Sequence, residues 1–361
     1  MIFISLFAFL ALVILGHYFA WWLCLSACPR LRVYRFYLLA VFIGFTIFFL
    51  GAFMVLHRSD SAILAALYVL SAIFFGLLSQ LMLFGVVAWV LRLVLRGCKY
   101  LKNKPLLLPR VFVIIALVFF ALGTYNAFYP RIKTIHLQGW PEELQGKRFV
   151  QLSDLHLGAV YRPFWLEKIV RQTNALNPDF IIISGDLFDG SDEILAEFVP
   201  SLKDFSAPTI FVPGNHDYYV PAGVANETAN SGDLIVLSDA AQEVSGLEII
   251  GFNYLAREDS NLRREIQGLR PEADLVRIVV NHVPVDQAEA KNLGAKLLLS
   301  GHTHRGQLFP FSAFVRLLYG RFSYGLEDYE GMTTNTSAGA GTWGPPLRTL
   351  FPGEIVEFVI E

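Results

Sequence analysis

Histidine, aspartate and asparagine gather in five short motifs in the C-terminal two-thirds of this chain. Of eight histidines, six lie beyond residue 130, and five of those six belong to the motifs. In chain order the motifs are Asp154-Leu-His156, Gly185-Asp186-Leu-Phe-Asp189, Gly214-Asn215-His216-Asp217, Asn281-His282 and Gly301-His302-Thr-His304. Carboxylate, imidazole and amide oxygen without thiolate suit divalent Mn, Fe, Zn or Co. Seven such ligands are too many for one ion, so the motifs predict a binuclear metal centre.

A short apolar run of the kind that forms buried strands precedes each motif. These runs are residues 149–152, 180–184, 210–212, 278–280 and 297–300. Each motif therefore falls where a strand ends, the usual place for ligands in an open sheet. Taken singly, a motif such as Gly214-Asn215-His216-Asp217 is more simply a turn, and Gly185-Asp186 a helix-capping loop. Five motifs at five successive strand ends favour the metal site.

The apolar fraction of 54% is high for a soluble protein, and the excess lies before residue 130. Four apolar runs there each reach the length of about 20 residues that crosses a bilayer. They are residues 2–23, 36–56, 63–90 and 111–128. We predict a four-helix transmembrane region at residues 1–130, followed by a catalytic domain at residues 131–361, in which residues 164–177 have helical spacing.

Charges between the apolar runs predict the orientation. The first gap holds Arg30, Arg32 and Arg35, and residues 92–110 hold six Lys and Arg, whereas the second gap holds Arg58 and Asp60. The positive-inside rule makes the first and third gaps cytoplasmic. We therefore expect an integral protein of the cell (inner) membrane with an extracytoplasmic catalytic domain. A cleaved signal ending at Cys28 is disfavoured, because the basic residues follow the first apolar run.

The net charge of −2 conceals two opposite halves. Residues 1–130 carry ten Lys and Arg and one Asp, or +9, so the remaining 19 Lys and Arg and 30 Asp and Glu give residues 131–361 a charge of −11. An acidic domain does not suit nucleic acid, whose phosphates require a basic surface. All three cysteines lie in the membrane half, so no disulfide framework is predicted. Nothing in the sequence predicts a protein partner.

The five motifs together read D-x-H, G-D-x-x-D, G-N-H-D, H and G-H-x-H, and this order resembles the calcineurin-like metallophosphoesterase superfamily. The later segments Ser323-Tyr324-Gly325-Leu326 and residues 341–348 resemble its membrane-associated bacterial subgroup. The resemblance covers residues 147–361. It implies an α/β domain built as an α/β/β/α sandwich, with two mixed sheets, helices outside and the metals at one sheet edge.

The resemblance also implies a role for each motif residue. The ligands of the first ion would be Asp154, His156 and His304, and those of the second Asn215, His282 and His302. Asp186 would bridge the two ions. His216 would face the phosphate as general acid. Asp217 would orient the His216 ring, and Asp189 would order its loop.

These residues imply hydrolysis of a phosphodiester or phosphoanhydride by a metal-held hydroxide. Residues 311–324 combine aromatic residues, leucines and arginines just after the last motif, which extends the expectation to a lipid or lipid-linked substrate at a membrane surface. The alternative for this segment is ordinary packing against the domain. The alternative function is a catalytically weak membrane receptor domain that binds a phosphate ligand, although such a domain has no need of His216. A transporter is disfavoured because the apolar runs contain no Asp, Glu or Lys.

Overall fold

The computed structural model describes residues 2–56, 59, 61–220, 223–254 and 275–361. Contacts divide the chain into two units, which we describe separately. The first contains Met1–Val55, Ala66–Tyr125 and Gly344–Leu347, and the second Leu56–Ala65, Asn126–Trp343 and Arg348–Glu361. The predicted charges Arg58 and Asp60 lie outside the described residues.

Four long helices make up most of the first unit, in the ranges that the apolar runs predict. They are α1 (Ile2–Ala27), α2 (Arg35–Leu56), α3 (Ala62–Val94) and α5 (Leu107–Phe128), with the short η1 (Pro29–Tyr34) and α4 (Lys99–Asn103) in the connections. Within the described residues, Pro29–Val55, Ala62–Val94 and Leu107–Phe128 are long and apolar enough to cross a membrane, and Val13–Ala27 is a shorter apolar stretch. Helices that are apolar all round are typical of membrane spans.

Close helix packing and one buried polar pair hold this unit together. A Cβ on Gly85 of α3 would lie 2.5 Å from the carbonyl oxygen of Phe19 in α1, so the two backbones approach as small residues permit. Nε2 of His17 lies 3.0 Å from Oγ1 of Thr46, which joins α1 to α2. Both side chains are buried, so this histidine completes a hydrogen bond within the helices.

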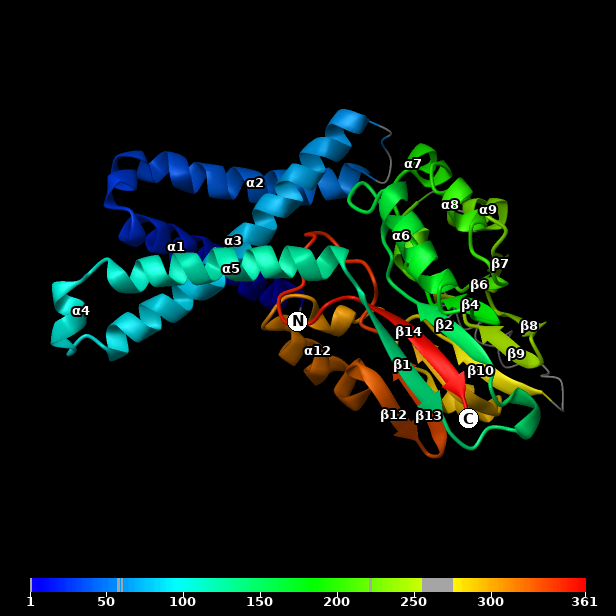
Figure 1. The fold of residues 1–361 in the computed structure, drawn as a ribbon. Helices are drawn as coiled ribbons and strands as arrows, with labels where there is room; N and C mark the ends of the chain where they lie inside the picture. Colours follow the sequence, from blue (N-terminus) through cyan, green and yellow to red (C-terminus); the bar gives the residue numbers. More distant parts are fainter. Residues whose placement is uncertain (1, 57–58, 60, 221–222, 255–274) are drawn as a thin grey trace. The chain divides into compact units, whose positions relative to one another are not determined.

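The second unit contains two six-stranded mixed sheets. The first sheet has the order β1-β14-β2-β4-β6-β7, in which the C-terminal strand β14 pairs in parallel with β1 and antiparallel with β2 (Figure 1). Its strands are β1 (Arg131–Leu137), β14 (Glu354–Ile360), β2 (Arg148–Leu152), β4 (Phe180–Ile183), β6 (Thr209–Phe211) and β7 (Ile235–Val236). Strands β2, β4, β6 and β7 are mutually parallel, so their carboxyl ends meet at one edge.

The second sheet has the order β12-β13-β11-β10-β9-β8. Its strands are β12 (Gly325–Tyr329), β13 (Met332–Thr336), β11 (Ala295–Ser300), β10 (Val276–Val280), β9 (Leu247–Gly251) and β8 (Ala240–Val244). The four central strands are parallel, and the two edge strands are antiparallel to their neighbours. A separate two-stranded ribbon joins β3 (Leu157–Gly158) to β5 (Phe188–Asp189).

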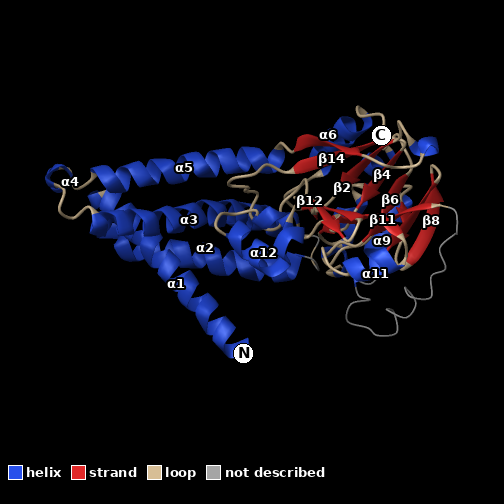
Figure 2. Ribbon diagram, turned by 90° about the horizontal axis from the view of Figure 1, so that it is seen from below, coloured by secondary structure: helices blue, strands red, loops and turns tan. Residues whose placement is uncertain are grey.

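Three apolar layers show that the domain is the expected α/β/β/α sandwich. Side chains such as Phe149, Ile182, Ile278 and Leu299 fill the space between the sheets. The outer face of the first sheet packs against α6 and its neighbours, and that of the second against α11; Figure 2 shows α6 and α11 on opposite sides of the sheets. The helices are α6 (Pro163–Asn174), α7 (Asp192–Ala196), α8 (Val199–Lys203), α9 (Val224–Ser231), α11 (Gln287–Asn292) and α12 (Phe311–Tyr319).

A buried amide joins the two sheets directly beneath the strand ends. Gln151 of β2 donates to Oγ of Ser184 at 2.8 Å and to the carbonyl of Ser300 at 2.9 Å. Its oxygen accepts from Asn335 of β13 at 2.8 Å. A buried polar group must find partners of this kind. The network therefore fixes the position of the ends of β2 and β4 against those of β11 and β13, where the motifs begin.

Candidate metal centre

The five motifs follow neighbouring strands and converge at the carboxyl ends of both sheets. Asp154, Asp186 and Asn215 come two to four residues after β2, β4 and β6. His282 and His302 come two residues after β10 and β11. Three groups of side chains have ligand atoms within 4.8 Å of one another in the described residues: Asp154 with His156 and His304, Asp186 with His282 and His302, and His156 with Asp186 and His216.

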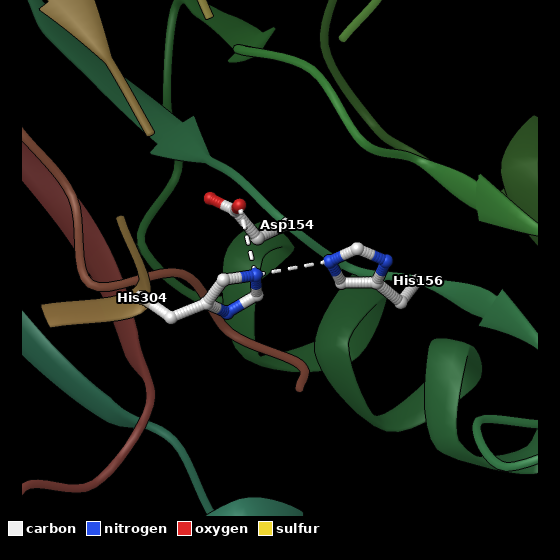
Figure 3. Close-up of side chains that lie close together, drawn as sticks. All are labelled: Asp154, His156 and His304. Atoms are coloured by element: carbon white, nitrogen blue, oxygen red, sulfur yellow. Dashed lines mark hydrogen bonds and ion pairs between the residues drawn. The ribbon is translucent and has the colours of Figure 1, made fainter. Parts of the chain in front are cut away.

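The first group has its ligand atoms turned toward one another, as Figure 3 shows. Nε2 of His304 lies 3.3 Å from Oδ1 of Asp154 and 3.1 Å from Nε2 of His156. Burial lowers the pKa of His156 to about 3, so its ring is neutral at neutral pH. Metal ligation requires the neutral imidazole. The arrangement therefore presents a carboxylate and lone pairs to one point.

Asp186 lies between the groups, where a bridging carboxylate belongs. One oxygen, Oδ2, is 3.0 Å from Nε2 of His282 and 3.9 Å from Nε2 of His156. The other, Oδ1, accepts the backbone N–H of His216 at 2.8 Å. Burial pushes the pKa of the Asp186 carboxyl upward, but His282 and His216 outweigh it and hold that pKa well below its usual range. Asp186 is therefore charged, as a bridge between two cations must be.

The ligands predicted for the second ion, Asn215, His282 and His302, have buried or partly buried side chains. Among the described residues, Oδ1 of Asn215 has no hydrogen-bond partner, and an unpaired buried polar atom is costly. Nε2 of His282 lies 3.0 Å from the Asp186 carboxylate. The other ring nitrogen of His282 lies 2.8 Å from the Ser184 carbonyl. If that nitrogen carries the proton and donates, Nε2 is the one left to bind metal. Burial lowers the pKa of His302 to about 4, so this ring is neutral. For His282 the charge of Asp186 outweighs burial and raises the pKa to about 9, so metal ligation would require this ring to lose its proton. These atoms fit a divalent ion.

Five of the seven predicted ligands have a left-handed backbone. They are Asp154, His156, Asp186, His302 and His304, with φ between 47° and 69°. This conformation costs a residue other than glycine on the order of 1–3 kcal/mol, and it persists where the surrounding structure enforces it. Each of these residues turns the chain sharply just after a strand. The strained turns direct the side chains back over the strand ends instead of along them.

Two motif glycines leave room for the ligands. A Cβ on Gly214 would lie 2.3 Å from Oδ1 of Asp186, and one on Gly301 would lie 1.9 Å from Oγ of Ser153 and 2.4 Å from Oδ2 of Asp154. Real Cβ atoms essentially never lie within 3.0 Å of another heavy atom to which they are not bonded through the chain. The glycines of the third and fifth motifs are therefore required by close approach to the carboxylates.

His216 lies beside the two groups, in an aromatic surrounding. Its ring centroid is 4.6 Å from that of His156, 4.5 Å from Tyr219 and 5.9 Å from Trp343. Burial lowers the pKa of His216, but Asp186 and Asp189 outweigh this and raise it above its ordinary value. A protonated imidazole is thereby favoured. A ring nitrogen of His216 also lies within 4.8 Å of ligand atoms of Asp186 and His156. The position of His216 therefore suits both a proton donor and a metal ligand.

The two neighbouring aspartates differ from the expected arrangement. Oδ1 of Asp189, expected only to order its loop, lies 3.5 Å from Nδ1 of His216. Asp217, expected to orient that ring, accepts the backbone N–H groups of Gly214 at 2.8 Å and Phe188 at 2.9 Å. A carboxylate that receives backbone amides fixes loop geometry. The orienting contact to the imidazole of His216 is therefore made by Asp189, and Asp217 fastens the third motif to the second.

Arg348 is a further buried residue of the site whose role the sequence motifs did not reveal. It is fully buried, and its guanidinium donates to the carbonyls of Ala338 and Gly341, each at 2.6 Å, and of His304 at 3.2 Å. The Ala340 and Gly341 amides in turn donate to the carbonyls of Ser153 and Asp154. Arg348 thus ties the loop of the fifth motif to the loop that supports the first. The only sequence signal was its place in residues 341–348.

The sandwich and the ligand groups at its strand ends together define a metallophosphoesterase. Residues 147–306 match the family model for calcineurin-like phosphoesterases. An uncharacterized metallophosphoesterase of Helicobacter pylori J99 is 30% identical over 328 residues, which cover 85% of this chain and 88% of that protein. The chain belongs to the calcineurin-like phosphoesterase family.

Two further relatives extend this similarity. An uncharacterized metallophosphoesterase of Campylobacter jejuni is 30% identical and covers 89% of each chain. A Bos taurus protein named as a transmembrane protein with metallophosphoesterase domain is 27% identical, over 72% of this chain and 64% of its own length. The similarities to the Helicobacter and Campylobacter proteins extend into residues 1–130, because they cover 85% and 89% of this chain, more than residues 131–361 alone.

Proposed function

We propose that this protein is a membrane-anchored hydrolase that cleaves a phosphodiester or phosphoanhydride with two divalent ions. The observation that supports it best is the position of the Asp186 carboxylate between two groups of ligand atoms. Asp154, His156 and His304 would hold one ion and Asn215, His282 and His302 the other. Bound divalent ions polarise the phosphoryl oxygens and make hydroxide available near neutral pH.

The protein's own residues would complete the reaction around those ions. His216, with its raised pKa, would donate a proton to the leaving oxygen, because a cleaved phosphoester releases an alkoxide or phosphate that must be neutralised. Asp189 would hold Nδ1 of this ring and leave Nε2 for the transfer. The carboxylates of Asp154 and Asp186 would offset two of the four positive charges of the ions. The remaining charge attracts the phosphate.

The test is metal-dependent hydrolysis of bis-p-nitrophenyl phosphate by the full-length protein in detergent. Chelation should abolish the activity, and Mn, Fe, Zn or Co should restore it to different extents, which identifies the preferred metal. His136→Ala is a matched control, because this histidine is exposed and lies on β1 away from the ligand groups. A protein that binds two ions yet hydrolyses neither this diester nor a pyrophosphate would favour the phosphate-receptor alternative.

For the substrate, the proposal extends to a lipid or lipid-linked phosphate. Only Tyr129 and Pro130 separate α5 from β1, so this linker spans about 10 Å at most. A substrate in the same membrane gains a large effective concentration that a freely diffusing one does not. Vesicles that carry a long-chain prenyl diphosphate provide the probe. Hydrolysis there should exceed that of a short soluble diphosphate at equal concentration; equal rates would contradict the lipid substrate.

The proposed location of the domain is outside the cytoplasm, at the cell membrane. The nine Lys and Arg in the first and third connections, against the two residues Arg131 and Lys133 after α5, support this orientation. Protease added to intact spheroplasts should digest the chain after residue 130. Protection of the domain, with cleavage at residues 92–110 instead, would invert the orientation.

A further inference from the structure

Helix α12 has an apolar face that the catalytic domain leaves uncovered. None of its nine residues is buried. Phe311, Phe314, Leu317 and Leu318 are 53%, 56%, 80% and 61% exposed. Their spacing of three or four residues places them on one side of a helix. The partly buried side chains of Ser312, Val315 and Tyr319 have the same spacing and lie on the other side. Ordinary packing against the domain, the alternative open from the sequence, does not account for this face.

Both charges near this face are positive. Between Gln307 and Leu326 the charged residues are Arg316 and Arg321, and both are exposed. The rest of the domain is strongly acidic, since residues 131–361 have a net charge of −11. An apolar helical face in a segment whose charged residues are arginines is the composition of helices that lie in the headgroup layer of an anionic bilayer. The local charge is opposite to that of the domain and complementary to anionic lipid.

The helix is also connected to the metal centre at both of its ends. Its first turn begins at Phe311, after the short segment 305–310 that follows the fifth motif. Gly306 of that segment packs so closely on Ser312 that an added Cβ would lie 2.3 Å from the Ser312 Cα. At the other end, the ring centroid of Tyr319 is 6.1 Å from that of His302. Just beyond it, the Ser323 carbonyl accepts the hydroxyl of Thr303 at 2.8 Å. The loop that contains the predicted ligands His302 and His304 is therefore held by the same segment that contains the apolar face.

We infer that α12 is an interfacial helix whose apolar face enters the headgroup layer of an anionic phospholipid bilayer, with Arg316 and Arg321 supplying the local positive charge that attracts the helix to anionic lipid. The same chain has apolar helices that are long enough to span a bilayer, so a membrane is an available partner for this face. The inference goes beyond the proposed hydrolysis and needs no catalysis. It assigns to the domain a second membrane contact, next to the fifth motif.

The experiment measures the depth of one side chain in the full-length protein. In a background with Cys24, Cys28 and Cys98 changed to serine, Leu317→Cys carries a nitroxide spin label, and Gln242→Cys, an exposed position on β8, is the control. Both proteins are placed in nanodiscs of phosphatidylcholine with and without phosphatidylglycerol. Collision with oxygen and with a water-soluble nickel chelate then gives the depth. Bound divalent metal and circular dichroism equal to those of the unlabelled protein confirm folding.

We expect the label at 317 to favour oxygen over the nickel chelate and to lie about 5–10 Å below the phosphates, whereas the label at 242 favours nickel. In the labelled protein, Arg316→Glu with Arg321→Glu should make the label at 317 shallower in the anionic nanodiscs and change it little in pure phosphatidylcholine. A label at 317 that collides with nickel as readily as the control overturns the inference. Protection from both reagents overturns it as well, since protein, such as a second copy of the chain, would then cover the face. The depth of the label is measured independently of the diester assay, so failure of this inference does not count against the proposed hydrolysis.

Discussion

In the first sheet Asp154, Asp186 and Asn215 follow the ends of three strands, whereas in the second sheet His282 follows one strand and His302 and His304 follow another. The first sheet thus contributes the oxygen ligands and both negative charges, with His156 in addition. The second contributes three imidazole rings: burial lowers the pKa of His302 and His304, whereas Asp186 raises that of His282 to about 9. Hard cations are held mainly by charge, and imidazoles add selectivity for Mn, Fe, Zn or Co.

Because each sheet provides only part of the ligand set, the site depends on the contacts that join the two sheets. Ligands of the two sheets are in direct contact: Asp186 lies 3.0 Å from His282, and His304 lies 3.3 Å from Asp154 and 3.1 Å from His156. Arg348 forms an indirect connection: it holds the loop after β13, whose Ala340 and Gly341 amides donate to the carbonyls of Ser153 and Asp154 after β2. Gln151 forms the third, beneath the ligands. The predictions below remove the cross-sheet and single-sheet contacts in turn.

The largest effect is expected for Asp186→Asn. The amide keeps the shape of the carboxylate but loses the charge shared by both groups, so metal content and activity should fall by orders of magnitude. Elemental analysis of the purified protein, with the diester assay, measures both. A fully metallated and active Asp186→Asn protein would remove the binuclear interpretation.

His216→Ala should separate chemistry from binding. His216 follows β6 of the first sheet. Loss of this proton donor should lower kcat by about 10²–10⁴, while both ions should remain bound. Metal analysis beside steady-state kinetics gives the two readouts. Loss of an ion would show instead that His216 is a ligand, as its distance to Asp186 also allows.

Arg348→Met should weaken the indirect contact between the sheets. Methionine fills much of the volume but leaves the carbonyls of Ala338, Gly341 and His304 without their donor. We expect a loss of about 3 kcal/mol in the free energy of unfolding, since each unpaired buried carbonyl costs about 1–3 kcal/mol. Denaturant unfolding of the metal-free protein measures it, with Arg171→Met on the exposed face of α6 as control. Equal stabilities of the two variants would contradict this role.

Asp189→Asn should have the smallest effect, because it stays within the first sheet. Asparagine can still contact Nδ1 of His216 but removes a charge that raises the pKa of this ring. A general acid works while protonated, so activity falls as pH rises through that pKa. The alkaline limb of the kcat profile should therefore move to lower pH, with a loss of about 10-fold. Asp217→Asn is the comparison; an equal shift of the limb in that variant would contradict the assignment of the orienting contact to Asp189.

Local sequence pattern predicts the strands that carry the ligands. The runs 149–152 and 278–280 lie inside β2 and β10, because short, mainly apolar runs of this length are typical of buried strands. Periodicity likewise predicts a helix at residues 164–177; α6 starts one residue earlier, at Pro163, and ends three residues earlier, at Asn174. The sandwich is the fold that the family resemblance implies. These are properties of contiguous residues, which a single sequence displays.

Contacts between distant segments were not predictable in the same way. The exchange of roles between Asp189 and Asp217 depends on the direction in which two loops turn, and the motifs are silent on that. Arg348 reaches His304 across 44 residues. Whether α12 is buried depended on which face the domain covers, and its residue types suit both a core and a membrane surface.

The place of β14 has a consequence for how the protein is made. This strand lies between β1 and β2, so the first sheet cannot close until residues 354–360 have left the ribosome. During synthesis β1, which follows the last apolar helix at once, has no neighbour to pair with on that side, and an unpaired strand edge invites aggregation. If the domain crosses the membrane, it must do so as an open chain that acquires its metals on the far side. Metal loading is then a late event of biogenesis, controlled by the ions of that compartment.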